Sequence, residues 1–156
     1  MLKILVYLLL NLYTARLNAT IDNSEQLKKS FDENIVNAPV SYLEGSNRHM
    51  IAYKKVSYPK SNKSLVFIHG TGENMQRYTH VARYFYAEGF NIYMYDQRGH
   101  GYSGRFTDSS VKIHTDSFER QVEDLSFMVN LAVDGLKDNQ VYLVGHSMGG
   151  LIALRY

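Results

Sequence analysis

Three short, mostly apolar runs, separated by segments with the spacing of helices, constrain the fold of this chain most strongly. The runs cover residues 65–68, 90–95 and 141–144. Each is too short for a helix and has the composition of a strand buried inside a parallel sheet. Between them, apolar side chains recur at helical spacing over residues 78–85 and 118–133. Strand and helix therefore alternate, which predicts an α/β fold with helices covering a parallel sheet.

The segments around this core have their own local signals. Apolar residues recur every four positions between 24 and 37, which predicts a short amphipathic helix. Two β-rich runs, residues 40–43 and 50–58, flank a Gly-Ser-Asn turn and predict an antiparallel hairpin ahead of the parallel strands. Asp116 and Glu119 have the spacing of a capping box, so we expect them to open the long helix.

Composition excludes several classes of function. The chain has 156 residues, which favours one domain, and its lack of Cys excludes disulfides, Cys-ligated zinc and a thiol nucleophile. Lys and Arg number 17 against 15 acidic residues, and the two surplus charges, Lys3 and Arg16, lie in the first 19 residues. The neutral remainder has no basic surface for a nucleic acid. No His pair has metal-ligand spacing, so we expect packed or solvated roles for four of them: His49, His80, His100 and His114.

The N-terminus has the features of a targeting segment. A short basic start is followed by an apolar stretch over residues 4–13, and Leu17-Asn18-Ala19 offers a cleavage site. Residues 1–19 therefore predict export to the periplasm or cell exterior. An uncleaved membrane anchor and a cytoplasmic apolar N-terminus are the alternatives. Residues 20–39 are expected to form a short helix and linker, and residues 40–156 the α/β domain.

The strongest chemical signal is Gly145-His146-Ser147-Met148-Gly149. It matches the G-x-S-x-G nucleophile elbow and stands between a predicted strand and a predicted helix, where that motif belongs. The sharp turn needs glycine at its flanks and holds the serine in strain, with its hydroxyl above the sheet. The N-terminus of the following helix favours a developing negative charge. A Gly-Ser turn without catalytic function is the alternative.

A second glycine-containing loop, His69-Gly70-Thr71-Gly72, follows the strand predicted at residues 65–68. In this type of fold, such a loop supplies one backbone N–H to the oxyanion hole, and the residue after the nucleophile supplies the other. The N–H groups of Thr71 and Met148 are therefore the expected donors. His69 has two interpretations, a general base or a brace for the loop, and we favour the brace.

A third glycine-rich loop, residues 96–104, contains the spacing G-x-G-x-x-G at Gly99, Gly101 and Gly104. A dinucleotide-binding motif must open directly into a helix, whereas the residues after Gly104 are polar and aperiodic. We therefore expect a structural turn, with Asp96 and Arg98 bracing neighbouring loops. Dinucleotide binding remains the weaker alternative.

Together these blocks resemble the serine-hydrolase branch of the α/β-hydrolase fold, and in particular monoacylglycerol lipases and bacterial lysophospholipases of the L2 kind. The resemblance is carried by residues 67–73, 96–104 and 145–150 and extends over residues 40–156. It implies Ser147 as the nucleophile, acyl esters of glycerol or lysophospholipid as small-molecule substrates, and a lipid surface as a site of association. It implies no metal and no organic cofactor.

The sequence departs from this family pattern after the nucleophile. In the α/β-hydrolase fold, the triad acid and then the triad His follow the serine along the chain. Only nine residues follow Ser147, and none is acidic or His. We therefore expect the N-terminal part of a serine ester hydrolase, truncated after the elbow and inactive by itself. An inactive exported remnant or binding module is the alternative, and no oligomeric state is predicted.

Overall fold

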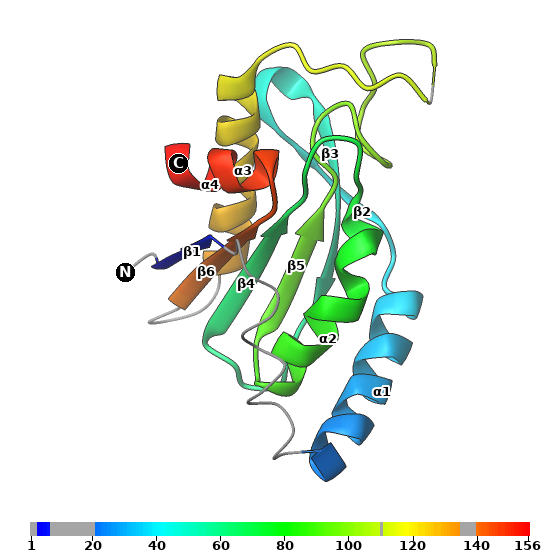
Figure 1. Ribbon diagram of the computed structural model, residues 1–156, viewed down its shortest axis with the longest axis vertical. Helices are drawn as coiled ribbons and strands as arrows, with labels where there is room; N and C mark the ends of the chain where they lie inside the picture. Colours follow the sequence, from blue (N-terminus) through cyan, green and yellow to red (C-terminus); the bar gives the residue numbers. More distant parts are fainter. Residues whose placement is uncertain (1–2, 7–20, 110, 135–139) are drawn as a thin grey trace.

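A computed structural model describes residues 3–6, 21–109, 111–134 and 140–156, and within these residues the chain forms a six-stranded mixed sheet flanked by helices (Figure 1). The strand order is β1-β6-β4-β5-β3-β2. The strands are β1 (Lys3–Val6), β2 (Ser41–Glu44), β3 (Met50–Val56), β4 (Lys63–Ile68), β5 (Asn91–Tyr95) and β6 (Gln140–Gly145). The α-helices are α1 (Ile21–Asn37), α2 (Thr79–Ala87), α3 (Phe118–Val133) and α4 (Met148–Arg155), and short 3₁₀ turns are η2 (Ser46–Arg48) and η3 (Met75–Tyr78).

The pairing of the strands confirms the fold predicted from the apolar runs. β4 lies between β5 and β6 and pairs with both in parallel. β2 and β3 form the predicted antiparallel hairpin, and β3 then pairs antiparallel with β5. Because β4, β5 and β6 are parallel, the loops that follow them emerge at the same edge of the sheet.

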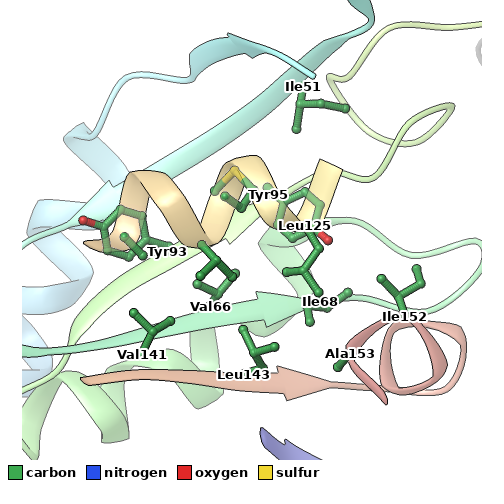
Figure 2. Packing of buried hydrophobic residues seen from close by; sticks show 13 residues of the cluster. Ile51, Val66, Ile68, Tyr93, Tyr95, Leu125, Val141, Leu143, Ile152 and Ala153 are labelled. Carbon is green, nitrogen blue, oxygen red and sulfur yellow. The ribbon is translucent and has the colours of Figure 1, made fainter. Parts of the chain in front are cut away.

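Side chains that alternate along the central strands build two hydrophobic layers. Val66 and Ile68 of β4 face α3 and α4, in the layer drawn in Figure 2. Leu65 and Phe67 face the opposite way and pack with residues of α1 and α2. The stripe predicted for the first helix contributes to this second layer, where Phe31 is fully buried.

The capping box predicted at Asp116 and Glu119 is wrong. α3 begins at Phe118, and its N-cap residue, Ser117, makes no side-chain capping bond. The carboxylate of Asp116 instead accepts hydrogen bonds from Arg98, at 2.8 Å, and from Arg120. Two guanidinium groups compete for Asp116 more strongly than a backbone N–H does, because charge-assisted hydrogen bonds are the stronger ones.

Most of the predicted targeting segment lies outside the described residues. Its four described residues form β1, which pairs in parallel with β6 at the sheet edge, with Lys3 opposite Tyr142. Cleavage and export therefore stay predictions. No helix in the described part of the chain has the length and apolar character needed to cross a membrane.

Candidate active site

Ser147 lies in the sharp turn between β6 and α4, with φ 52° and ψ −120°. This left-handed backbone is unfavourable for a residue with a side chain, so the surrounding structure must impose it. Two glycines make the turn sterically feasible. A Cβ on Gly145 would lie 2.5 Å from the carbonyl oxygen of Gly149, and a Cβ on Gly149 would lie 2.1 Å from the carbonyl oxygen of Ile68. The nucleophile-elbow geometry therefore follows from the glycine spacing.

The loop after β4 lies directly against this turn. His146 donates its backbone N–H to the carbonyl of Ile68, at 3.0 Å. A Cβ built on Gly70 would lie 3.2 Å from the Cβ of Ser147. The hydroxyl of Thr71 contacts the sulfur of Met148 at 3.2 Å, although the two residues are 77 positions apart. The two predicted oxyanion-hole residues thus meet beside the serine.

The backbone N–H groups of these two residues have no protein acceptor among the described hydrogen bonds. Met148 is the first residue of α4, so its N–H has no carbonyl one turn earlier in the helix. Thr71 is exposed and lies outside the regular elements. Two N–H donors are therefore available beside an exposed serine, and such an arrangement is able to stabilise an oxyanion.

His69 is buried behind the loop, and both of its ring nitrogens are engaged. Its Nε2 accepts the backbone N–H of Gln97 at 3.0 Å. The ring proton therefore resides on Nδ1, which donates to the carbonyl of Gly70 at 2.8 Å. Burial lowers the pKa of His69, and His100 lowers it further, against the hydrogen bond to Gly70 and the attraction of Asp96 and Glu73. His69 is thus a neutral imidazole whose contacts hold the loop backbone.

The loop with the dinucleotide-like spacing closes on itself. The N–H of Gly99 donates to the carbonyl of Gly104 at 3.0 Å, and a Cβ on Gly101 would lie 2.0 Å from a carboxylate oxygen of Asp96. The helix that follows is α3, which begins only at Phe118. The loop therefore lacks the helix N-terminus that a dinucleotide site requires. His100, in this loop, accepts the N–H of Gly72 at 3.3 Å, so the loop also supports the one after β4.

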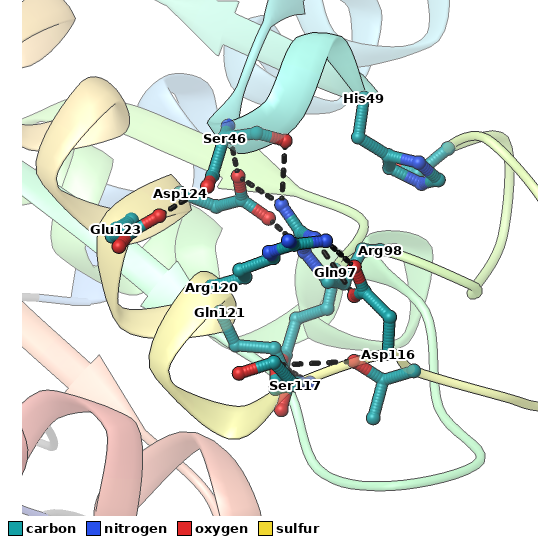
Figure 3. Close-up of polar contacts among 12 residues, drawn as sticks. Ser46, His49, Gln97, Arg98, Asp116, Ser117, Arg120, Gln121, Glu123 and Asp124 are labelled. Carbon is teal, nitrogen blue, oxygen red and sulfur yellow. Dashed lines mark hydrogen bonds and ion pairs between the residues drawn. The ribbon is translucent and has the colours of Figure 1, made fainter.

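Arg98 anchors the same loop from inside the protein (Figure 3). Its side chain is fully buried, and two of its nitrogens bind the carboxylate of Asp124 on α3 at 2.7 and 2.9 Å. The remaining bonds go to Asp116 and to the carbonyl of Ser46 in η2. Hydrogen bonds from Arg98 and Arg120, against the opposing effect of burial, lower the pKa of Asp116 to about 2. The guanidinium therefore joins the loop after β5, η2 and α3.

Glu73 makes several polar contacts in the site, although the sequence assigns it no role. One of its carboxylate oxygens accepts from the hydroxyl of Tyr78 at 2.5 Å, from the N–H of Gly70 at 2.9 Å and from Nδ1 of His146 at 3.0 Å. The other lies 3.0 Å from Nε of Arg77. Burial opposes ionisation, but these hydrogen bonds lower the pKa of Glu73 to about 2. The only sequence signal for this cluster is the charge and close spacing of Glu73, Arg77 and Tyr78.

Among the described contacts, no general base is hydrogen-bonded to the serine. No hydrogen bond in the described part of the chain involves the hydroxyl of Ser147, and both nitrogens of His69 are occupied. His49 stacks on Phe106, and its Nε2 is hydrogen-bonded to the carbonyl of Gly104 at 2.8 Å. Within the described residues, no group of three or more His, Asp or Glu side chains is arranged to hold a metal ion.

Comparison with known proteins agrees with this geometry. Residues 59–156 match the family described as serine aminopeptidase, S33 (Hydrolase_4). A probable lysophospholipase L2 from Haemophilus influenzae is 32% identical over 120 residues, covering 76% of this chain and 38% of that protein. A monoacylglycerol lipase from Mycolicibacterium smegmatis is 37% identical over 92 residues, covering 59% of this chain and 31% of the lipase. The chain thus spans less than two fifths of the length of either relative.

Solved structures show the same fold. A variant of an epoxide hydrolase from Vigna radiata has a TM-score of 0.61 and 21% identity, covering 77% of this chain and 34% of that chain. An esterase from Exiguobacterium antarcticum has a TM-score of 0.60 and 21% identity, covering 76% of this chain and 39% of the esterase. Two different activities on one scaffold show that the fold alone does not select the reaction. The family match decides membership: the chain belongs to the serine aminopeptidase S33 family (Hydrolase_4) and has the N-terminal part of an α/β-hydrolase fold.

Proposed function

We propose that this chain carries the nucleophile and the oxyanion hole of a serine ester hydrolase. The observation that carries the proposal is the strained turn at Ser147 beside Thr71 and Met148, whose side chains are in contact and whose backbone N–H groups have no protein acceptor among the described hydrogen bonds. A strained, exposed serine with backbone N–H donors nearby suits acyl transfer, because charge develops on the carbonyl oxygen of the substrate during attack.

In the proposed reaction, the hydroxyl oxygen of Ser147 bonds to the carbonyl carbon of an ester and its proton passes to a general base. The carbonyl oxygen becomes an oxyanion, which the N–H groups of Thr71 and Met148 stabilise. Loss of one such donor costs ~10²–10³ in kcat. When the oxyanion collapses, the ester C–O bond breaks and the base returns its proton to the departing alcohol. Water then hydrolyses the acyl-serine by the same route.

The general base and its orienting carboxylate are required by this reaction and are not supplied by the described contacts of Ser147. In the α/β-hydrolase fold, both follow the nucleophile along the chain. A serine hydroxyl without a base is a weak nucleophile. The proposal therefore assigns attack and oxyanion stabilisation to this chain. It assigns proton transfer to none of the described residues, and the chain by itself is expected to show no ester turnover.

The substrate class proposed is a small-molecule lipid ester, with monoacylglycerols and lysophospholipids first. The names of two relatives, a monoacylglycerol lipase and a probable lysophospholipase, support this class. Apolar surface near the oxyanion loop also suits an acyl chain. The side chain of Ile113 is 44% exposed, and its terminal carbon lies 3.8 Å from a Cβ built on Gly72. Export by residues 1–19 and association with a lipid surface belong to the same proposal.

Covalent labelling with a fluorophosphonate tests the function. The reagent phosphonylates a serine through an oxyanion-like transition state, so a formed hole should direct it to Ser147. With the hole intact and the base absent, residual acceleration over water reaches up to ~10³. We expect mass spectrometry to find the label on Ser147 and none after Ser147→Ala. Ser126→Ala, on the surface of α3, is the matched control and should label normally. If Ser147 reacts no faster than other serines of the chain, the proposed function is wrong.

A further inference from the structure

The elbow and the oxyanion loop are joined by a side-chain contact that none of the proposed steps uses. Glu73 lies in the loop after β4, and His146 immediately precedes the nucleophile. Their carboxylate oxygen and Nδ1 are 3.0 Å apart. We infer that Glu73 and His146 form a positioning pair, which holds the N–H of Thr71 at the correct place relative to Ser147. This inference rests on the proposed function, because it assigns that N–H a role.

The contacts of Glu73 show how the pair acts on the loop. The carboxylate oxygen that binds His146 also accepts the N–H of Gly70, at 2.9 Å, one residue before Thr71. A Cβ built on Gly70 would lie 3.2 Å from three atoms at once: the Glu73 oxygen, His146 Nδ1 and the Cβ of Ser147. The carboxylate, the imidazole and the nucleophile therefore surround one point of the loop backbone. A shift of His146 relative to Glu73 would be transmitted to Gly70 and Thr71.

Charge makes the pair a strong contact. The carboxylate of Glu73 is ionised, and Arg77 and the hydroxyl of Tyr78 also face it. Hydrogen bonds to an ionised acceptor are stronger than those between neutral groups. The imidazole of His146 donates from Nδ1, and its side chain is 54% exposed. His146, on the elbow, is thus near solvent, whereas Glu73, in the loop, is held by Tyr78 and Gly70.

Because His146 is exposed, a positioning role for it can be distinguished experimentally from a role in stability. An exposed side chain with one principal partner, such as His146, contributes little to the free energy of unfolding. Misplacement of a catalytic donor by about 1 Å costs on the order of 10²-fold in rate. Replacing His146 should therefore reduce the reactivity of Ser147 and leave the melting temperature nearly unchanged, whereas replacing Glu73, which also holds Tyr78, Gly70 and Arg77, lowers stability as well.

The test compares variants of the full chain by their rates of fluorophosphonate labelling at Ser147 and by thermal unfolding. His146→Ala and Glu73→Gln should each slow labelling about 10- to 100-fold. The double variant should be no slower than the slower single variant, because residues acting as a unit are not additive. His146→Asn keeps an N–H donor near Nδ1 and should restore much of the rate. His80→Ala, an exposed His on α2, is the control.

Labelling of His146→Ala within about twofold of the parent chain, or additive losses in the double variant, would overturn the inference. So would an equally slow His146→Asn variant. If the parent chain itself is not labelled at Ser147, the proposed function fails, and NMR then decides the pair separately. The amide signals of Gly70 and Thr71 should move in His146→Ala and return in His146→Asn. Unmoved signals would refute the contact.

Discussion

Replacing Arg98 with Met should be among the most destabilising single changes that the described structure allows. The guanidinium is fully buried and binds Asp124 at 2.7 and 2.9 Å, so its loss leaves a carboxylate in the interior with only the N–H of Ser46, at 2.8 Å, as partner. Removing one member of a buried ion pair costs about 3–5 kcal/mol. Because small domains have only about 5–15 kcal/mol of stability, the loss is readily measured by urea denaturation.

The design includes a matched Arg and a compensating double variant. Arg120 also binds Asp116, but its side chain is 39% exposed, so Arg120→Met should cost no more than about 1 kcal/mol. Arg98→Met combined with Asp124→Leu removes both buried charges and should recover much of the stability, because apolar replacement of a whole buried pair is often neutral. An Arg98→Met chain within about 1 kcal/mol of the parent, or a double variant no more stable than Arg98→Met, would refute this reasoning.

The pH dependence of the same variant follows from Asp124. Burial raises the pKa of this carboxyl, against the hydrogen bonds from Arg98 and Ser46 that lower it. Without Arg98, the pKa should rise further. An acid whose pKa is higher in the folded than in the unfolded state binds more protons when folded, so its folded state gains stability as the pH falls. The loss of unfolding free energy in Arg98→Met relative to the parent chain should therefore be smaller at lower pH than at pH 7. A loss that does not change with pH would contradict this expectation.

Three further predictions concern the site itself. Gly149→Ala should destabilise the chain by about 1–3 kcal/mol or more, because its Cβ would overlap a backbone carbonyl, whereas Leu151→Ala, exposed on the same helix, should change urea stability far less. Since burial lowers the pKa of His69, the unfolding free energy should fall as the pH drops below about 6.5, by up to ~1.4 kcal/mol per unit, and His69→Gln should flatten this dependence. The chain alone should show no turnover of monoacylglycerol above that of Ser147→Ala, so Ser147-dependent hydrolysis would show that the chain supplies its own base.

Local and periodic signals predicted much of the fold. The three central strands are encoded by continuous apolar runs, and the hairpin by its turn residues, so each is recognisable without knowledge of its neighbours. The elbow motif is also local in sequence, and the contact of Gly145 with the carbonyl of Gly149 lies within it, whereas Gly149 meets the carbonyl of Ile68 on the distant strand β4. The capping box failed for the opposite reason. Arg98 and Arg120 compete for Asp116 in the folded chain, and neither contact follows from local capping preference.

The side chains that support the site are harder to predict than the site. The sequence leaves two roles open for His69. Its role as a brace depends on the hydrogen bond from the N–H of Gln97, 28 positions away. Glu73 and His146 are 73 positions apart, and no periodicity brings them together. The partners of a polar side chain depend on which loops share an edge of the sheet, and that is known only once the strand order is known.

The strained turn and the two N–H groups proposed as donors are backbone features, and the glycine contacts that shape the turn lie within the described residues. Proton transfer needs a side chain at hydrogen-bonding distance from Ser147, which is a long-range property of the complete site. Under the proposed function, the described residues stabilise the transition state electrostatically but do not activate the nucleophile. Labelling at Ser147 and turnover of an ester measure these two contributions separately, and the structure predicts that the first occurs without the second.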